Sequence, residues 1–130
     1  MQNNKTLLTL LFLSVLSLPC QAAEEKATEN VKISEQAISN YGIQTTSVAR
    51  NQQITLPRSA FAVSKNEYFA YAKKDGGFIE IELHGFQPEN GNLAFLNKYE
   101  VDEFVTDGAK YLRIIFLSQQ NQSSGHGHGH

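Results

Sequence analysis

The sequence predicts a mainly β protein, a small antiparallel β-barrel or sandwich of about six to eight strands with one short N-terminal helix. Short stretches rich in β-branched and aromatic residues recur at near-regular spacing along the chain. Asp75-Gly76 and Asn90-Gly91 are two-residue hairpin signals between such stretches. Within residues 78–83, apolar and acidic side chains alternate, as they do in a strand with one buried face.

The helix is predicted directly after Ser34, which is a suitable N-cap. Ile38 and Tyr41 lie on one helical face, and Gly42 occupies a position where a left-handed C-cap is favoured. These signals define about two turns of helix. The strands that follow are predicted at residues 43–50, 53–56, 61–63, 68–73, 78–83, 93–96, 103–106 and 111–117.

The N-terminal residues predict export to the periplasm. Lys5 precedes an apolar run at residues 7–18, and small residues suitable for signal peptidase follow it. Because this run has about a dozen residues where a membrane span needs about 20, we favour a cleaved signal peptide at 1–22 over an uncleaved anchor. Residues 23–28 are then a linker, and we expect no membrane insertion after cleavage.

The single cysteine, Cys20, allows a second interpretation, a lipoprotein acylated on that residue. Bacterial lipoproteins normally have a small residue before the acylated cysteine, whereas Pro19 precedes it here. Cleavage after Ala22 or Ala23 would leave a mature chain without cysteine, which excludes disulfides and thiol chemistry.

Charge and length exclude other classes of function. Removal of Lys5 with the signal peptide leaves 10 of the 11 basic residues against 13 acidic ones, a net charge of −3. Since no basic cluster is larger than Lys73-Lys74, we expect no nucleic-acid binding. A mature chain of about 107 residues suits one small domain, which we place at 29–117.

The polar residues of this domain predict no catalytic group. Alternation places Glu80 and Glu82 on the solvent face of a strand, and His84 is expected at the surface because it has no second ligand at metal-binding spacing. Motifs such as a nucleophile elbow, a phosphate-binding loop, CxxC or HExxH are missing from the sequence. We therefore expect no enzyme, with no catalytic or cofactor-binding residues. Three acidic residues near a turn are interpreted as solvating the surface: Asp102, Glu103 and Asp107.

The C-terminal residues, 118–130, differ from the rest of the chain. Residues 118–124 contain no apolar side chain, so we expect them to be disordered. Glycine and histidine then alternate, and such His-rich tracts favour borderline divalent ions such as Zn, Cu or Ni. The candidate metal ligands are His126, His128 and His130. A solvated tail without function and an added tag are the alternatives, and no cofactor is obligatory.

Several segments carry a resemblance to a known family. Residues 31–48 are similar to the segment that opens the mature chain of heavy-metal-class efflux adaptors. Residues 56–60, Leu-Pro-Arg-Ser-Ala, look like the proline-led strand by which that family's chain returns, and residues 68–78 and 103–112 follow in the family's order. The body of the chain thus resembles the membrane-proximal domain of the periplasmic adaptors, or membrane fusion proteins, of resistance-nodulation-division efflux pumps.

The resemblance implies a membrane-proximal domain without the barrel, lipoyl and helical-hairpin domains of the family. Only residues 51–53 separate the outward and returning segments, so the two parts of the domain become contiguous. The sequence departs from the family in one loop, where Asn97 and Val101 stand in place of two usual glycines. Because Val tolerates a left-handed backbone poorly, we expect this turn to be built differently.

The resemblance also implies a function. It is that of a non-enzymatic periplasmic accessory of a heavy-metal or cation efflux system, which docks on the inner-membrane pump or on its full-length adaptor. A flexible His tail would add weak capture of divalent metal ions near the pump. Two alternatives stay open: a free periplasmic metal-binding or buffering protein, and a structural interaction module without metal.

Overall fold

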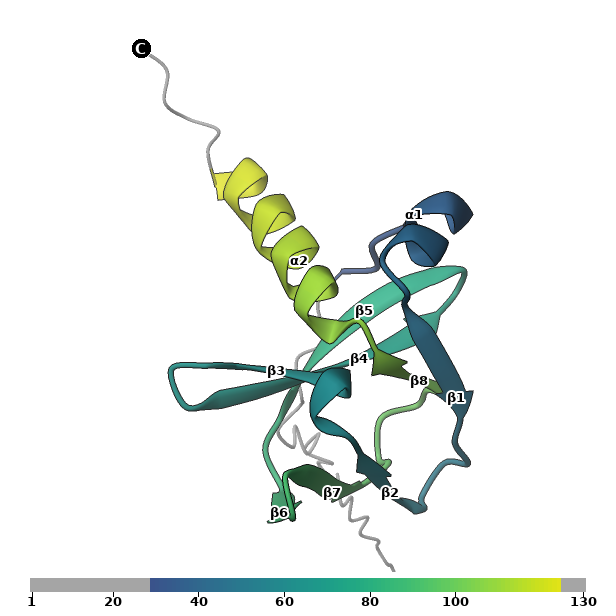
Figure 1. The fold of residues 1–130 in the computed structure, drawn as a ribbon, viewed down its shortest axis with the longest axis vertical. Coiled ribbons are helices and arrows are strands. Elements are labelled where there is room, and N and C mark those ends of the chain that lie inside the picture. Colours follow the sequence, from purple (N-terminus) through teal and green to yellow (C-terminus); the bar gives the residue numbers. More distant parts are fainter. Residues whose placement is uncertain (1–28, 125–130) are drawn as a thin grey trace, which may run out of the picture.

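The computed structural model describes residues 29–124, which form two antiparallel β-sheets and two α-helices (Figure 1). The elements in chain order are α1 (Glu35–Asn40), β1 (Gln44–Ser47), β2 (Gln53–Leu56), a 3-10 turn η1 (Arg58–Ala60), β3 (Phe61–Ser64), β4 (Glu67–Lys74), β5 (Gly77–Leu83), β6 (Phe86–Glu89), β7 (Asn92–Leu96), β8 (Glu103–Asp107) and α2 (Ala109–Ser124). The prediction of a mainly β fold with a short N-terminal helix is confirmed.

The larger sheet has five strands in the order β1-β8-β4-β3, with β5 paired to β4 as well. β3 and β8 share one edge of β4, and β5 pairs along the other edge in a hairpin that joins Tyr68 to Leu83 and Lys74 to Gly77. The smaller sheet has three strands in the order β2-β7-β6. The early strands β1 and β2 therefore pair with the late strands β8 and β7, which joins the two parts of the chain in one domain.

The capping signals around α1 form as the sequence predicts. The Ser34 hydroxyl accepts a hydrogen bond of 3.1 Å from the backbone N–H of Ala37. Gly42 has a φ of +64°, and its N–H donates to the carbonyl of Ser39 at 3.1 Å. Both contacts satisfy backbone groups that the ends of a short helix leave without intrahelical partners.

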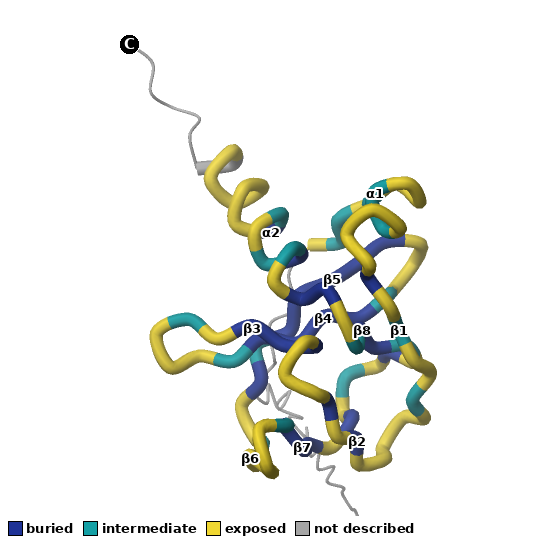
Figure 2. The backbone as a smooth tube through the Cα atoms, viewed as in Figure 1, coloured by how far each residue is buried: buried dark blue, intermediate teal, exposed yellow. Residues whose placement is uncertain are grey.

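The five-stranded sheet buries side chains on both of its faces, and many of the buried residues lie along β3, β4 and β5 (Figure 2). The inter-sheet core lies between the two sheets and comprises Ile54, Leu56, Ala60, Phe61, Ala70, Ala72, Ile79, Ile81, Leu83, Leu93, Phe95, Val101 and Phe104. The helix-side core lies under α2 and comprises Ile43, Ala62, Phe69, Tyr71, Phe78, Val105, Ala109, Leu112 and Phe116.

The C-terminal prediction is corrected by α2, which covers residues 109–124 where the sequence predicted a strand and then disorder. Gly108, with a φ of +96°, turns the chain out of β8, and an added Cβ there would lie 2.8 Å from Ile43. Leu112 and Phe116, four residues apart, then both meet the sheet, which is a helical spacing. The β-branched residues that follow Arg113 favour a strand locally, but packing on the sheet decides the outcome.

The extension of α2 through residues 118–124 has a second physical reason. Glutamine is a good helix former, and these residues include Gln119, Gln120 and Gln122. Adding residues to a helix that tertiary contacts have already nucleated costs much less than starting one. The predicted tail residues 125–130 lie outside the described part of the chain.

The loop between β7 and β8 is indeed built without left-handed residues at Asn97 and Val101, whose φ values are not among the positive ones. Asn97 is fully buried, and its side-chain amide donates to the carbonyls of Ala49 at 3.2 Å and Val101 at 3.0 Å. Its Oδ1 accepts from the N–H of Tyr99 at 3.3 Å. A buried amide therefore ties this loop to the connection between β1 and β2.

Candidate functional site

The predicted metal ligands His126, His128 and His130 lie outside the described residues. His84 is exposed in the connection from β5 to β6. Strand β6 lies at the opposite end of the molecule from the last turns of α2 (Figure 1). Within residues 29–124, the structure brings no three His, Cys, Asp or Glu side chains together around a possible metal position. His84 is therefore a surface residue, as predicted, and is not a neighbour of the point where the tail begins.

The prediction that Glu80 faces solvent was wrong, because Glu80 is only 2% exposed. Alternation assigns the correct face of β5, but α2 covers that face. The Tyr71 hydroxyl donates to Glu80 Oε2 at 2.6 Å, and Arg113 Nη1 of α2 donates to the same oxygen at 2.8 Å. Tyr71 stands directly opposite Glu80 in the β4–β5 register, so one carboxylate oxygen accepts from both the phenol and the arginine.

This buried network fixes the position of α2 on the sheet. The guanidinium of Arg113 also lies 4.1 Å from the ring centroid of Phe69, and the rings of Tyr71 and Phe116 are 5.7 Å apart. Burial, and then the hydrogen bond to the Glu80 carboxylate, raises the pKa of Tyr71 well above its ordinary value. The phenol is therefore a fixed donor, and the network is a structural anchor for the helix.

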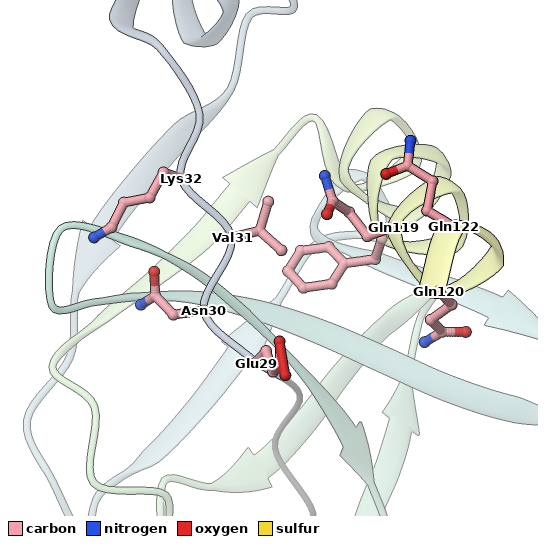
Figure 3. A pocket seen from close by; sticks show the side chains of 8 residues that line it. Glu29, Asn30, Val31, Lys32, Gln119, Gln120 and Gln122 are labelled. Carbon is pink, nitrogen blue, oxygen red and sulfur yellow. The ribbon is translucent and has the colours of Figure 1, made fainter. Parts of the chain in front are cut away.

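A cleft lies between the first described residues and the C-terminal half of α2 (Figure 3). We call it the amide cleft; its volume is about 580 Å³, and its lining residues are Glu29, Asn30, Val31, Lys32, Phe116, Gln119, Gln120 and Gln122. One wall is the extended segment before α1, and the other wall is the helix. Four of the eight lining residues carry a side-chain amide, and Val31 and Phe116 are the apolar lining.

The wall formed by the N-terminal segment is held by backbone and side-chain hydrogen bonds. Val31 and Phe78 exchange two backbone hydrogen bonds, each of 2.8 Å, across an antiparallel bridge. The side chain of Asn30 donates to the carbonyl of Lys74 and lies over Gly77, where an added Cβ would clash with Asn30 Oδ1. The Gly-Gly pair after Asp75 thus serves more than the predicted hairpin turn, since its second glycine makes room for this wall.

A second cleft of about 560 Å³ lies beside the start of α2 and includes two residues of the proline-led motif, Arg58 and Ser59. Arg58 donates to the carbonyl of Phe61 at 2.8 Å and lies 4.9 Å from its ring centroid. The Ser59 hydroxyl donates to the carbonyl of Thr106 at 2.8 Å. These polar groups therefore join η1 to β3 and β8, and the motif has a structural role in this fold.

The predicted acidic patch is divided between two contacts. Asp102 accepts from Arg50 at 2.8 Å in an exposed ion pair, and Glu103 accepts from the hydroxyl of Thr45 in the neighbouring strand. Both contacts connect the β1 region to β8, beside the ladder that pairs these strands. Asp102 and Glu103 therefore help to hold β1 against β8 at the edge of the sheet.

The outer side of α2 carries an exposed apolar ridge. Tyr41, 42% exposed, stacks on Tyr111 of α2 with ring centroids 4.9 Å apart. Ile114 is 63% exposed and Leu117 is 40% exposed, each three residues further along the helix. We call these four residues the α2 ridge. Large apolar side chains grouped in this way on a small domain are typical of interaction surfaces.

Comparison with known proteins yields no relative: no protein-family model, curated protein or solved structure matches this chain. Neither α1 nor α2, the helices of the described part, has the length and apolar character needed to cross a membrane. The amide cleft and the α2 ridge were not predicted from the sequence, because both depend on α2 being helical. The spacing of Tyr111, Ile114 and Leu117 is the signal that could have revealed the ridge.

Proposed function

We propose that this protein is a non-enzymatic periplasmic accessory of a heavy-metal efflux system. In this proposal the β domain docks on the inner-membrane pump or its full-length adaptor, and the His tail captures divalent metal ions weakly. The observation that carries the proposal is the α2 ridge, which exposes Ile114 and Leu117 on the same helix that leads into the tail. One element would thus combine a docking surface with the metal-binding segment.

Two further features support the proposal. Strands β1 and β2 pair with β8 and β7 on either side of the short link at residues 48–52, so a membrane-proximal-like unit can fold without the family's other domains. The Tyr71, Glu80 and Arg113 network holds α2 in place, so the ridge is presented on a fixed helix rather than on a loop. A rigid apolar surface binds with less loss of conformational entropy than a flexible one.

Co-purification from detergent-solubilised membranes tests the docking part, with mass spectrometry to detect resistance-nodulation-division pump components. We expect the chain ending at Ser124 to retain the pump, and Ile114→Lys or Leu117→Lys to lose it. Val63→Lys is the matched control, because Val63 is 41% exposed but lies on β3, where alternation with Ala62 turns it away from the helix-side core. Docking through α2 would be contradicted if the ridge variants still retained the pump. It would also be contradicted if removal of the tail alone, in the chain ending at Ser124, abolished pump binding.

Metal titration tests the other part. The mature chain and the chain ending at Ser124 are titrated with Zn²⁺, Cu²⁺ and Ni²⁺ by calorimetry, and we expect only the longer chain to bind with measurable heat. Equal binding by both chains would remove the tail from the proposal.

A further inference from the structure

The second cleft, beside the start of α2, differs from the amide cleft in its charge. Two cations, Arg58 and Lys110, line it together with the aromatic residues Phe61 and Tyr111, and we call it the cationic cleft. Its volume of about 560 Å³ is within the range of clefts that bind small groups. The lining of the amide cleft, by contrast, balances one cation with one carboxylate.

The guanidinium of Arg58 is only partly used by the fold. Arg58 Nη1 donates to the carbonyl of Phe61 at 2.8 Å, and the guanidinium carbon lies 4.9 Å from the centroid of the Phe61 ring. A guanidinium carries five N–H donors in a planar fork, and no other described residue accepts from Arg58. The other two arginines of the chain, Arg50 and Arg113, are both paired with carboxylates. Arg58 is therefore the one arginine that lacks a carboxylate partner within residues 29–124.

Lys110 adds a second cation to the same cleft. Its Nζ lies 5.0 Å from the centroid of the Tyr111 ring, and no carboxylate in the described part of the chain forms an ion pair with it. Asp107 also lines the cleft, but among the described residues it pairs with neither cation. Two positive charges against one negative charge leave the cleft with a net positive charge, which attracts anions.

The lining favours a carboxylate over a phosphate. The planar fork of Arg58 matches the two oxygens of a carboxylate, and bidentate pairs of this kind are strong. Asp107 repels a doubly charged phosphate about twice as strongly as a singly charged carboxylate, because the repulsion is proportional to charge. The ring of Tyr111 adds apolar surface for a hydrocarbon stem. The expected ligand is therefore a carboxylate on an apolar stem.

The cationic cleft is continuous with the α2 ridge. Tyr111 belongs to both, and Lys110 shares a helical face with Ile114, four residues further along α2. The apolar ridge thus has a positively charged cleft at the end where α2 begins. Such a surface is complementary to an amphipathic segment that carries apolar side chains and a carboxylate beside them.

We propose that the cationic cleft and the α2 ridge form one docking surface, and that its partner is an acidic amphipathic segment. A carboxylate of that segment binds Arg58 and Lys110 in the cleft, while its apolar side chains cover Ile114 and Leu117. This inference rests on the proposed docking through α2, and it adds the chemistry of the partner. Charge complementarity of this kind fixes the register of docking and speeds association.

A small carboxylate tests the cleft without the pump. The mature chain is titrated with phenylacetate and with its neutral counterpart phenylacetamide, and the NMR signals of the Arg58 side chain and of the Lys110 backbone are followed. We expect only phenylacetate to shift these signals in a saturable way. Arg58→Gln should weaken phenylacetate binding by about tenfold, because it removes hydrogen bonds between charged groups. Lys110→Gln should weaken it by about two- to fivefold, as for one exposed charge.

The same variants are compared in co-purification of the pump. Arg58→Gln and Lys110→Gln should each retain less pump than the parent does. Lys65→Gln is the matched control and should behave as the parent in both measurements, because Lys65 is an exposed lysine in the turn after β3. The side chain of Lys110 makes no hydrogen bond within residues 29–124, so Lys110→Gln keeps the test decisive even if Arg58→Gln destabilises the fold.

The possible failures are distinguishable. Equal shifts with phenylacetate and phenylacetamide, unchanged phenylacetate affinity in Lys110→Gln, or an equal loss of affinity in Lys65→Gln would overturn the carboxylate site. Tighter binding of inorganic phosphate than of phenylacetate would also overturn it. Full pump retention by both cleft variants, with loss in Ile114→Lys, would overturn the joint surface and leave docking through the ridge intact. If the parent itself retains no pump, the proposed function and the joint docking surface both fail, whereas the phenylacetate titration still decides whether the cleft binds a carboxylate.

Discussion

The two faces of the five-stranded sheet are both buried, but they are stabilised by different chemistry. The face toward the three-stranded sheet is apolar throughout its cluster, with Phe104 packed edge-on against Phe95 at 5.7 Å between ring centroids. The face under α2 places the hydroxyl of Tyr71, the carboxylate of Glu80 and the guanidinium of Arg113 in contact. One face is packed by apolar side chains alone, and the other combines apolar packing with directed polar contacts.

This difference indicates what each face contributes. Apolar burial is non-directional, so the inter-sheet core stabilises the fold without specifying one position for each neighbour. The contact between Arg113 and Glu80 requires one placement of α2, because a buried carboxylate that loses its cation is costly. The orientation of the α2 ridge and the shape of the amide cleft both depend on that placement. The inter-sheet core therefore stabilises the fold without fixing α2, and the helix-side core positions the candidate functional surfaces.

The largest expected effect tests the inter-sheet core. Phe104→Ala should lower the free energy of unfolding by about 3–5 kcal/mol, because the side chain is fully buried and leaves a cavity. Urea denaturation followed by circular dichroism measures the change. Val63→Ala is the control, since Val63 is exposed and should have little effect. A loss below about 1 kcal/mol in Phe104→Ala would show that the core can collapse around the cavity.

The next effect tests the anchor of α2. Arg113→Met keeps much of the apolar stem but removes the cation from Glu80, and should cost about 2–3 kcal/mol, below the value for a fully buried pair because the Arg113 side chain is 19% exposed. Hydrogen exchange should show reduced protection in α2 with little change in β2, β6 and β7. If β2, β6 and β7 lost as much protection as α2, the contact of Arg113 with Glu80 would stabilise the whole domain and would not act on α2 in particular.

Tyr71→Phe should have a smaller effect with a characteristic pH dependence. It removes the hydrogen bond to Glu80 and should cost about 1.5 kcal/mol near neutral pH. The pKa of Tyr71 is raised in the folded state, so above about pH 10 the unfolded chain releases a proton that the folded chain keeps. The contribution of this phenol to stability is complete below that pH and decreases above it.

The measurement is the difference in unfolding free energy between the parent and Tyr71→Phe from pH 8 to pH 11. We expect this difference to be constant up to about pH 10 and then to diminish by up to about 1.4 kcal/mol per pH unit, because one proton is involved. A difference that stays constant through pH 11 would argue against a raised pKa for Tyr71.

The same contrast between faces explains what the sequence predicted. On β5, alternation correctly separated Ile79, Ile81 and Leu83 from the two glutamates, and Leu83 and both isoleucines do lie in the inter-sheet core. Alternation identifies which residues share a face, but it does not reveal whether another element covers that face. Glu80 was therefore assigned to the correct side of the strand and to the wrong environment.

The C-terminal error has the same origin. Ile114 and Ile115 favour a strand locally, whereas the helix is selected by contacts of Leu112 and Phe116 with distant parts of the chain. Those contacts are non-local, and within residues 111–117 they leave only a helical spacing of apolar side chains, which the β-branched pair obscures. The α1 caps and the Asp75-Gly76 hairpin depend on neighbouring residues, and they were predicted correctly. The cleft and the ridge, which need α2 as a helix, could not be predicted from the strand interpretation.

The smallest expected effect tests whether the strength of an ion pair depends on its burial or on the distance between its charged groups. Arg50 and Asp102 form an ion pair with the same 2.8 Å separation as Arg113 and Glu80, but their side chains are 52% and 69% exposed. Water and salt screen such a pair, so Arg50→Ala should leave the urea midpoint unchanged, although the hydrogen bond to Asp102 raises the pKa of Arg50. A loss in Arg50→Ala as large as that in Arg113→Met would mean that separation, and not burial under α2, determines the strength of these pairs. The contact of Arg113 with Glu80 would then not be what fixes α2 on the sheet. The positions of the cleft and the ridge would instead depend on the apolar contacts of Leu112 and Phe116.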